Sequence, residues 1–265
     1  MFKNNMTPNS LPERVFQVGT YLSKNAASLS DIRKYFTLDE GKSDAVSDTL
    51  TAARELDLLT ESGNNYALNV SPEVFKSMDS FRLYCNSKVF ADHNDLFYRV
   101  TQVMLNLYES KEGRSYTGIS FTSSKFENYM RDRVLSMNNI SQNMRGWRFW
   151  ASFLGLGVIT KPNKDAFVFM PNMYVNLKDA ITNSNIPSGT YTIREFLSYV
   201  EPYCSVAFPE NGNMQLNLAM SNGLRCLNDL KDAIVTSEND AKETWLVNEI
   251  KTHKIQSSVS HIQIK

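Results

Sequence analysis

The chain has 265 residues, of which 42% are hydrophobic and 21% are charged, a composition that fits a soluble globular protein of two or three small domains. Lys and Arg together number 28, as do Asp and Glu, so the formal net charge is zero. Because strong duplex binders usually carry a basic excess that neutralises phosphates, this balance argues against tight DNA binding by the whole surface. It does not exclude DNA binding by one local basic face.

The cysteines, the first residues and the lengths of the apolar segments indicate the cellular compartment. Cys85, Cys204 and Cys226 are widely spaced and match neither a disulfide framework nor a zinc-binding pattern, so we expect free thiols in a reducing compartment. The first residues, MFKNN, have no apolar segment typical of a signal peptide, and no window approaches the ~18 apolar residues of a membrane span. We therefore expect a cytoplasmic protein with no membrane partner.

The first 71 residues predict a winged helix-turn-helix unit. Apolar residues at helical spacing predict helices over residues 11–24 and 28–36, and a third helix whose inward face ends at Leu56. The stretch LTESGNNYALN then predicts a β-hairpin, with its turn at residues 62–65. Three helices followed by a hairpin, or wing, in about 60 residues is typical of a winged helix.

A helical linker over residues 72–114 and a second unit over residues 115–185 follow. Ser123 or Ser124 can cap a helix, and a second helix carries apolar residues through Leu154. The stretch FLGLGVITKPNKDAFVFMPN predicts that this helix ends at a glycine and leads into a hairpin whose turn includes Lys161 and Lys164.

A third unit is predicted over residues 186–265. Thr192 and Glu195 have the spacing of a capping box, and a later helix ends near Leu230. Residues 233–235 and 244–247 are the predicted strands of its wing. Leu56, Leu154 and Leu230 hold equivalent places, and we expect each to be buried where the last helix meets the wing. The predicted fold class is α+β, mainly helical, with tandem winged helix-turn-helix units and a helical linker.

Three segments carry a resemblance to a known family: FWASFLGLGVI (149–159), AMSNGLRCLNDL (219–230) and VSHIQI (259–264). The chain resembles DpdG-type tandem winged-helix proteins, which are encoded in bacterial defence clusters beside machinery that places 7-deazaguanine derivatives in DNA and restricts unmodified DNA. The resemblance spans nearly the whole chain. It implies a context, a multi-protein system for DNA modification or defence, and it supplies no catalytic residues.

Patterns of catalytic chemistry are missing from the sequence. His93, His253 and His261 are too scattered for a metal site, and the chain has no phosphate-binding GxxxxGK[ST] loop and no GxSxG nucleophile elbow. The sequence Gly155-Leu156-Gly157 lacks the later glycine of a dinucleotide fingerprint. We therefore predict that the protein is not an enzyme and holds neither cofactor nor metal.

The second unit offers the best candidate surface for DNA. Carboxamides can read adenine edges and guanidinium groups can read guanine, while lysines contact phosphates without regard to sequence. The plainer alternative is the polar start of an ordinary surface helix. The candidate DNA-binding residues of this unit are Asn139, Gln142, Asn143, Arg145, Arg148, Lys161 and Lys164, and Asn138 adjoins them.

The other two units have acidic residues where DNA would lie. Asp44 and Asp48 begin the last helix of the first unit, and the third wing carries Glu238, Asp240 and Glu243. Carboxylates at these places repel phosphates. We therefore expect the first unit to dock proteins or to be purely structural, and the third unit to face proteins.

The sequence thus predicts a non-catalytic winged-helix adaptor of a bacterial DNA-directed defence or DNA-modification system. Its partners would be other proteins of that complex, with double-stranded DNA as a further candidate. The alternative is a sequence-specific transcriptional regulator, which basic recognition helices and a two-fold dimer interface would favour. An enzyme with a site assembled across units is a third hypothesis.

Overall fold

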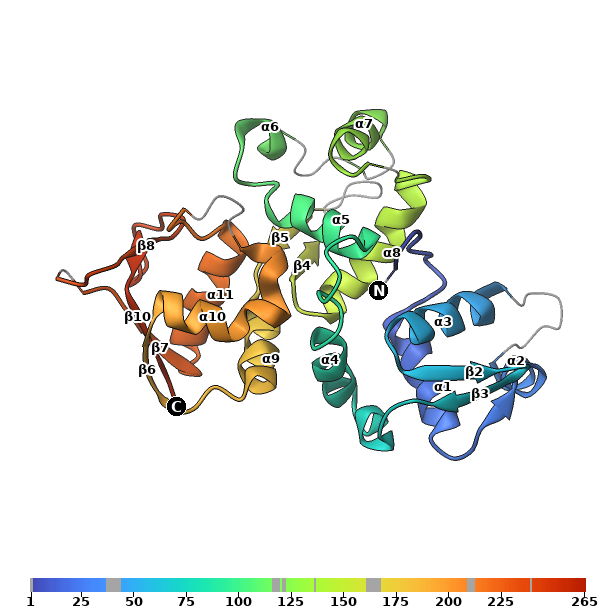
Figure 1. Ribbon diagram of the computed structural model, residues 1–265. Coiled ribbons are helices and arrows are strands. Elements are labelled where there is room, and N and C mark those ends of the chain that lie inside the picture. The colour runs from blue at the N-terminus through green and yellow to red at the C-terminus, as the bar shows by residue number, and fades with distance from the viewer. Residues whose placement is uncertain are drawn as a thin grey trace.

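The computed structural model describes residues 2–36, 44–115, 120, 123–135, 137–160, 168–208, 213–238 and 240–265. Over these residues the protein is a mainly helical α+β structure, which confirms the predicted fold class at that level. Three groups of helices with small sheets, here called the first, middle and third bodies, lie side by side in an elongated arrangement (Figure 1). None of the described helices is long and apolar enough to cross a membrane.

The first body packs three helices against a three-stranded antiparallel sheet of strand order β1-β3-β2. The predicted inward face of α3 is confirmed, since Val46, Leu50, Ala53 and Leu56 are all buried. A hairpin with Gly63 in the left-handed region (φ 61°) joins β2 to β3. The elements are α1 (Pro12–Leu22), β1 (Ala27–Ser28), α2 (Leu29–Phe36), α3 (Asp44–Glu55), β2 (Leu59–Ser62) and β3 (Asn65–Leu68).

The middle body contains the long helix α8, which packs against α5 and α7 and leads into a two-stranded hairpin, β4-β5. Trp147 and Trp150 of α8 are both fully buried, so this helix forms the core of the body. The connecting elements are η1 (Pro72–Phe75), α4 (Met78–Asn86) and α6 (Lys111–Arg114). The body itself comprises α5 (Leu96–Leu105), α7 (Ser124–Arg133), α8 (Ile140–Phe153), β4 (Gly157–Thr160) and β5 (Val168–Pro171).

The third body packs α9, α10 and α11 beside a three-stranded sheet of order β6-β10-β7. The predicted capping box of Thr192 and Glu195 is confirmed at the start of α10. The elements are α9 (Tyr174–Ser184), β6 (Gly189–Thr192), α10 (Ile193–Cys204), η2 (Ser205–Ala207), α11 (Leu218–Asp229), β7 (Ala233–Thr236), β8 (Trp245–Leu246), β9 (Ser258–Val259) and β10 (His261–Ile264).

The predicted strand pairing of the third body is wrong. We expected residues 244–247 to return beside residues 233–235, but β7 pairs with β10 at the end of the chain, and β8 pairs with β9. In β10 the buried Ile262 and Ile264 alternate with the half-buried His261 and the exposed Gln263, so one face of this central strand lies in the core. The C-terminal segment VSHIQI therefore supplies the central strand.

The helices α3, α8 and α11 end in the same turn. In each, a leucine is followed by a residue with a positive φ, and the next residue donates its backbone N–H to a carbonyl five positions back. This is the geometry of a Schellman helix end, which satisfies carbonyls left without helical partners. The turns are Leu56-Asp57-Leu58, Leu154-Gly155-Leu156 and Leu230-Lys231-Asp232, with φ of 57°, 72° and 62° at the middle residues.

One of the three leucines contradicts the prediction that all are buried. Leu56 and Leu154 are buried as expected, whereas Leu230 is 61% exposed. The buried face of α11 runs through Leu224 and Leu227, and Leu230 lies beside this row. The apolar residue that follows the turn in the first two bodies is replaced by Asp232, whose carboxylate accepts hydrogen bonds from Tyr174 and Lys178. This polar corner leaves Leu230 in contact with solvent.

Buried polar contacts fix α4 between the end of α8 and α9. The Asp179 carboxylate of α9 accepts hydrogen bonds from Arg82 Nε (2.9 Å) and Asn86 Nδ2 (2.7 Å) of α4. Asn86 Nδ2 also donates to the carbonyl oxygen of Leu154 at 3.2 Å. Since Asn86 and Asp179 are buried, these bonds contribute to holding the middle and third bodies in one arrangement.

Residues 2–10 form an arm that lies along α8 (Figure 1). The Phe2 ring lies 5.6 Å from Trp150 and 6.2 Å from Phe97, centroid to centroid, and Met6 is fully buried. Trp150 Nε1 donates to the carbonyl oxygen of Ser10 at 2.6 Å. The arm therefore ties the first body to the middle one along the face of α8.

The arm packs directly on Gly146 of α8. We expect replacement of this glycine by alanine to destabilise the protein, although Gly→Ala changes in helices usually stabilise. A Cβ at this position would overlap the Met6 carbonyl oxygen. Gly→Ala inside a helix normally stabilises by ~1 kcal/mol, but here we expect Gly146→Ala to destabilise by about 1–3 kcal/mol through overpacking. Thermal unfolding checks this, with Ser152→Ala on the exposed side of α8 as the control. A stabilised Gly146→Ala protein would mean that the arm does not lie on this helix.

The three cysteines differ in accessibility. Cys85 and Cys204 are fully buried, and burial raises the pKa of both thiols, while Cys226 is half-buried. Since the thiolate is the nucleophile, we expect iodoacetamide to modify at most Cys226 in the folded protein and all three after unfolding. Mass spectrometry of the two samples measures this. Modification of Cys85 at equal rates in both would contradict its burial.

Candidate nucleic-acid interface

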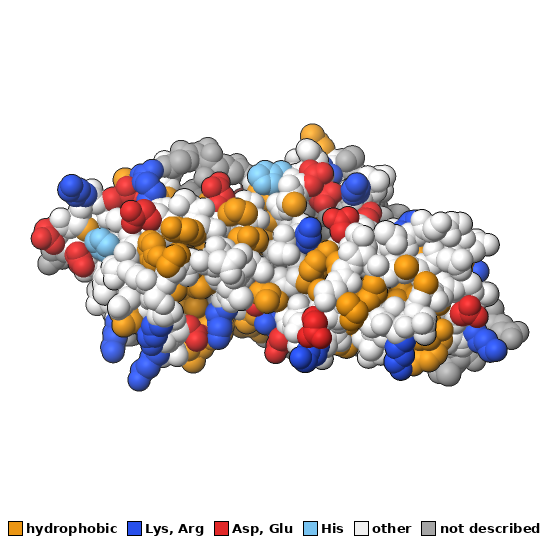
Figure 2. Space-filling view, turned by 60° about the horizontal axis from the view of Figure 1, so that its bottom comes forward, with side chains coloured by type: hydrophobic (Ala, Val, Ile, Leu, Met, Phe, Trp, Pro, Cys, Tyr) orange, Lys and Arg blue, Asp and Glu red, His pale blue; other side chains and the backbone are white. Residues whose placement is uncertain are grey.

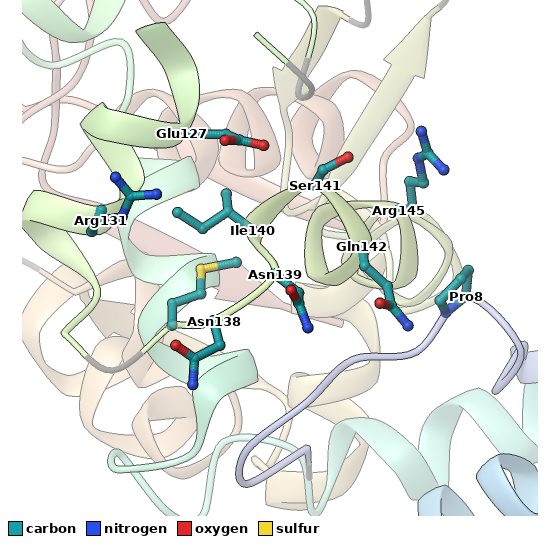
Figure 3. A pocket seen from close by; sticks show the side chains of 10 residues that line it. Pro8, Glu127, Arg131, Asn138, Asn139, Ile140, Ser141, Gln142 and Arg145 are labelled. Atoms are coloured by element: carbon teal, nitrogen blue, oxygen red, sulfur yellow. The ribbon is translucent and has the colours of Figure 1, made fainter. Parts of the chain in front are cut away.

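A pocket of about 560 Å³ opens at the start of α8, among the predicted DNA-binding residues (Figure 3). The turn before α8 and the first turns of the helix form one wall, α7 forms another, and the N-terminal arm borders it at Pro8. The lining residues are Pro8, Glu127, Arg131, Met137, Asn138, Asn139, Ile140, Ser141, Gln142 and Arg145.

Apolar anchors hold the turn that forms this pocket. Val134, Met137 and Ile140 are buried on either side of the turn and fix its path between α7 and α8. Asn139, between them, adopts the left-handed conformation (φ 47°), which asparagine tolerates better than most residues. Its side chain forms no capping hydrogen bond to α8 and is exposed, as is that of Asn138. Both carboxamides therefore face solvent at the pocket.

Asn143 does not belong to the candidate interface, contrary to the prediction. It is 1% exposed, and its Oδ1 accepts a hydrogen bond from the Met6 backbone at 2.5 Å. Its Nδ2 donates to the carbonyl oxygens of Asn138 (2.5 Å) and Asn139 (3.4 Å). The side chain is thus used to join the arm to the turn. The polar pattern of the helix start could not distinguish this buried amide from its exposed neighbours.

Gln142 and Arg145 are exposed on the side of α8 that borders the pocket, next to Pro8 (Figure 3). Arg148, one turn further, is half-buried, with its guanidinium carbon 4.6 Å from the centroid of the Phe149 ring. Burial lowers the pKa of Arg148, and the charge of Arg145 lowers it further. The guanidinium still remains charged at neutral pH, and the two arginines make this side of α8 locally basic.

Helix α7 contributes two pocket residues that the sequence interpretation missed, Glu127 and Arg131. They lie four residues apart, on one face of α7, and both line the pocket (Figure 3). Their i, i+4 spacing indicates from the sequence that they share one face of a helix. Only the packing of α7 against α8 shows that this face adjoins the turn before α8. Arg131 lies across the pocket from Arg145, so guanidinium groups border it on opposite sides.

Lys161 and Lys164 lie outside the described residues, so their predicted phosphate contacts stay predictions from the sequence.

On α3 and α11, which correspond to α8 in the other two bodies, several polar side chains are buried or bonded within the protein. On α3, Thr49 is buried and donates to the Ala45 carbonyl, while Arg54 forms an ion pair with Glu61. On α11, Ser221 is fully buried and Arg225 is 4% exposed. Its guanidinium donates to backbone carbonyls of residues 248, 255 and 256, so its role is to hold the C-terminal segment.

Charges of both signs are interspersed on the face of the molecule seen in Figure 2, and hydrophobic side chains gather there in several separate patches. No group of three His, Cys, Asp or Glu side chains among the described residues has an arrangement that could hold a metal ion.

Comparisons with known proteins give no relative for this chain: no protein-family model matches it, and neither a curated protein nor a solved structure matches it significantly.

Proposed function

We propose that the protein is a non-catalytic winged-helix adaptor that contacts DNA through the start of α8 and binds partner proteins through its other bodies. The observation that carries the DNA contact is the cluster at the pocket: exposed Asn138, Asn139 and Gln142, with Arg131 and Arg145 on opposite sides. Carboxamides and guanidinium groups are the side chains that read base edges and phosphates.

Strand order supports the winged-helix part of the proposal. The sheets β1-β3-β2 and β6-β10-β7 share one order, and each is built from a strand before two helices and two strands after them. The shared helix ends at Leu56, Leu154 and Leu230 extend the likeness to the middle body. Since α9 packs on α10 and α11, we place α9 with the third unit, ahead of the boundary predicted at residue 186.

Surface composition favours an adaptor over the alternative, a sequence-specific regulator. On the β4-β5 hairpin, Val158 and Met170 are cross-strand partners, and they are 52% and 47% exposed. Residues directly opposite on antiparallel strands share a face, so the pair forms a small apolar spot on the hairpin that follows the end of α8. The resemblance to DpdG-type proteins supplies the proposed setting, a bacterial system for DNA modification or defence.

A salt titration of duplex binding by the full chain tests the proposal. With about three or four phosphate contacts, affinity should be micromolar at low salt and fall roughly 40- to 150-fold between 50 and 200 mM salt. Fluorescence anisotropy with two unrelated duplexes measures this, and we expect equal affinities within a few-fold. Nanomolar binding to one sequence at physiological salt would instead establish the regulator, and no binding at low salt would refute the DNA contact.

A further inference from the structure

We propose that the pocket at the start of α8 takes a single unpaired nucleotide of the DNA. The proposal rests on the proposed function, because it names the element of DNA that the same site binds. Arg131 and Arg145 would contact the phosphates on either side of this nucleotide, and the carboxamides would contact the edge of its base.

The shape of the site favours one nucleotide over a regular duplex groove. A volume of about 560 Å³ lies within the range of pockets that hold small molecules. A recognition helix that enters a major groove has to project from its surroundings. Here α7 and the arm at Pro8 rise on either side of the first turn of α8 and make the surface concave (Figure 3).

The placement of charge matches a nucleotide within a strand. Every internal nucleotide has a phosphate on its 5′ side and another on its 3′ side. The guanidinium groups of Arg131 and Arg145 lie on opposite sides of the pocket, so each can meet one of these phosphates (Figure 3). Arg131 Nη1 donates to Asn128 Oδ1 at 3.2 Å and keeps further N–H groups for a ligand.

The polar groups between the two arginines match the edge of a base. Asn138, Asn139 and Gln142 each offer donors and an acceptor. The carboxylate of Glu127 accepts hydrogen bonds only, so it favours a base with an exocyclic amino group, as in cytosine or adenine, over thymine. The half-buried Pro8 adds apolar surface against which a base can pack.

Asn143 is the positioning residue of this pocket. Its carboxamide joins the arm to the carbonyl oxygens of Asn138 and Asn139, and so fixes the turn before a ligand arrives. A preformed site has little ordering cost on binding, which matters for a ligand as small as one nucleotide.

The test compares the binding of the full chain to three labelled duplexes: fully paired, with one bulged cytosine, and with an abasic residue at the bulge. Because one good hydrogen-bonded contact to a base edge changes affinity by roughly tenfold, we expect the cytosine bulge to bind roughly tenfold more tightly than the other two. Arg145→Gln and Arg131→Gln should reduce the advantage of the cytosine bulge over the fully paired duplex, whereas Arg54→Gln on α3 should keep it. Glu127→Gln should reduce the preference for a cytosine bulge over a thymine bulge.

The outcomes separate this proposal from the proposed function. Equal affinity for the three duplexes, still lowered by Arg145→Gln, would overturn the nucleotide pocket and leave the DNA contact at α8 intact. An advantage of the bulge that survives Arg145→Gln and Arg131→Gln together would place the unpaired nucleotide elsewhere and overturn the pocket. Failure to bind any of the three would overturn both.

Discussion

Replacing Leu154 by alanine is expected to lower the free energy of unfolding by ~2–5 kcal/mol, and Leu56→Ala by a similar amount, the usual range for a buried leucine. Leu230→Ala is expected to change it by less than about 0.5 kcal/mol, because the side chain is exposed. The three residues occupy the same place in the same helix-end turn, and only the first two are buried. Urea unfolding followed by circular dichroism measures all three.

The third leucine is the control for the other two. Each substitution has the same intrinsic effect on a helix end, so the difference between the variants reports burial alone. A loss of more than 2 kcal/mol in Leu230→Ala would show that this side chain is covered in solution. A negligible loss in Leu154→Ala would contradict the packing of α8 in the middle body.

Reversing the charge of Arg145 is expected to produce the largest change in DNA affinity. Arg145→Glu removes one phosphate contact and adds a repulsion, so affinity at low salt should fall roughly 10- to 100-fold, with a shallower dependence on salt. Arg54→Glu on α3 changes the net charge equally, but Arg54 lies on another body and pairs with Glu61. This control should lower affinity by no more than a few-fold. Anisotropy titrations at two salt concentrations compare them.

Equal losses in the two variants would show that only the net charge of the protein matters. In that case α8 has no special role in DNA binding, and protein docking becomes the better account of all three bodies.

Local patterns in the sequence predicted local structure well. The inward face of α3, the Ser123 cap of α7 and the capping box of α10 are all confirmed, because each depends on residues within one or two turns of each other. The equivalence of Leu56, Leu154 and Leu230 is confirmed in backbone geometry for the same reason.

Contacts between residues far apart in the sequence could not be predicted from these local patterns. The strand that pairs with β7 is β10, which lies beyond β8 and β9, so a search for the nearest alternating segment chose the wrong partner. The arm was missed because its apolar residues, Phe2 and Met6, are few and show no periodicity.

The residues of the candidate site were predicted only in part, because some of them are neighbours in the sequence and others are brought together by long-range packing. Asn139, Gln142 and Arg145 lie together because one short segment carries them. Whether a polar residue of that segment is exposed depends on the arm, which buries Asn143, and on α7, which brings Glu127 and Arg131 to the pocket.

The most direct test of the proposed DNA contact is amide hydrogen exchange of the full chain with and without a duplex at low salt. Slower exchange in the presence of DNA is predicted for residues 127–131 and 137–148, with no change over α3 and α11. Protection confined to α3 or α11, with residues 137–148 unchanged, would contradict the assignment of α8 as the surface that meets DNA.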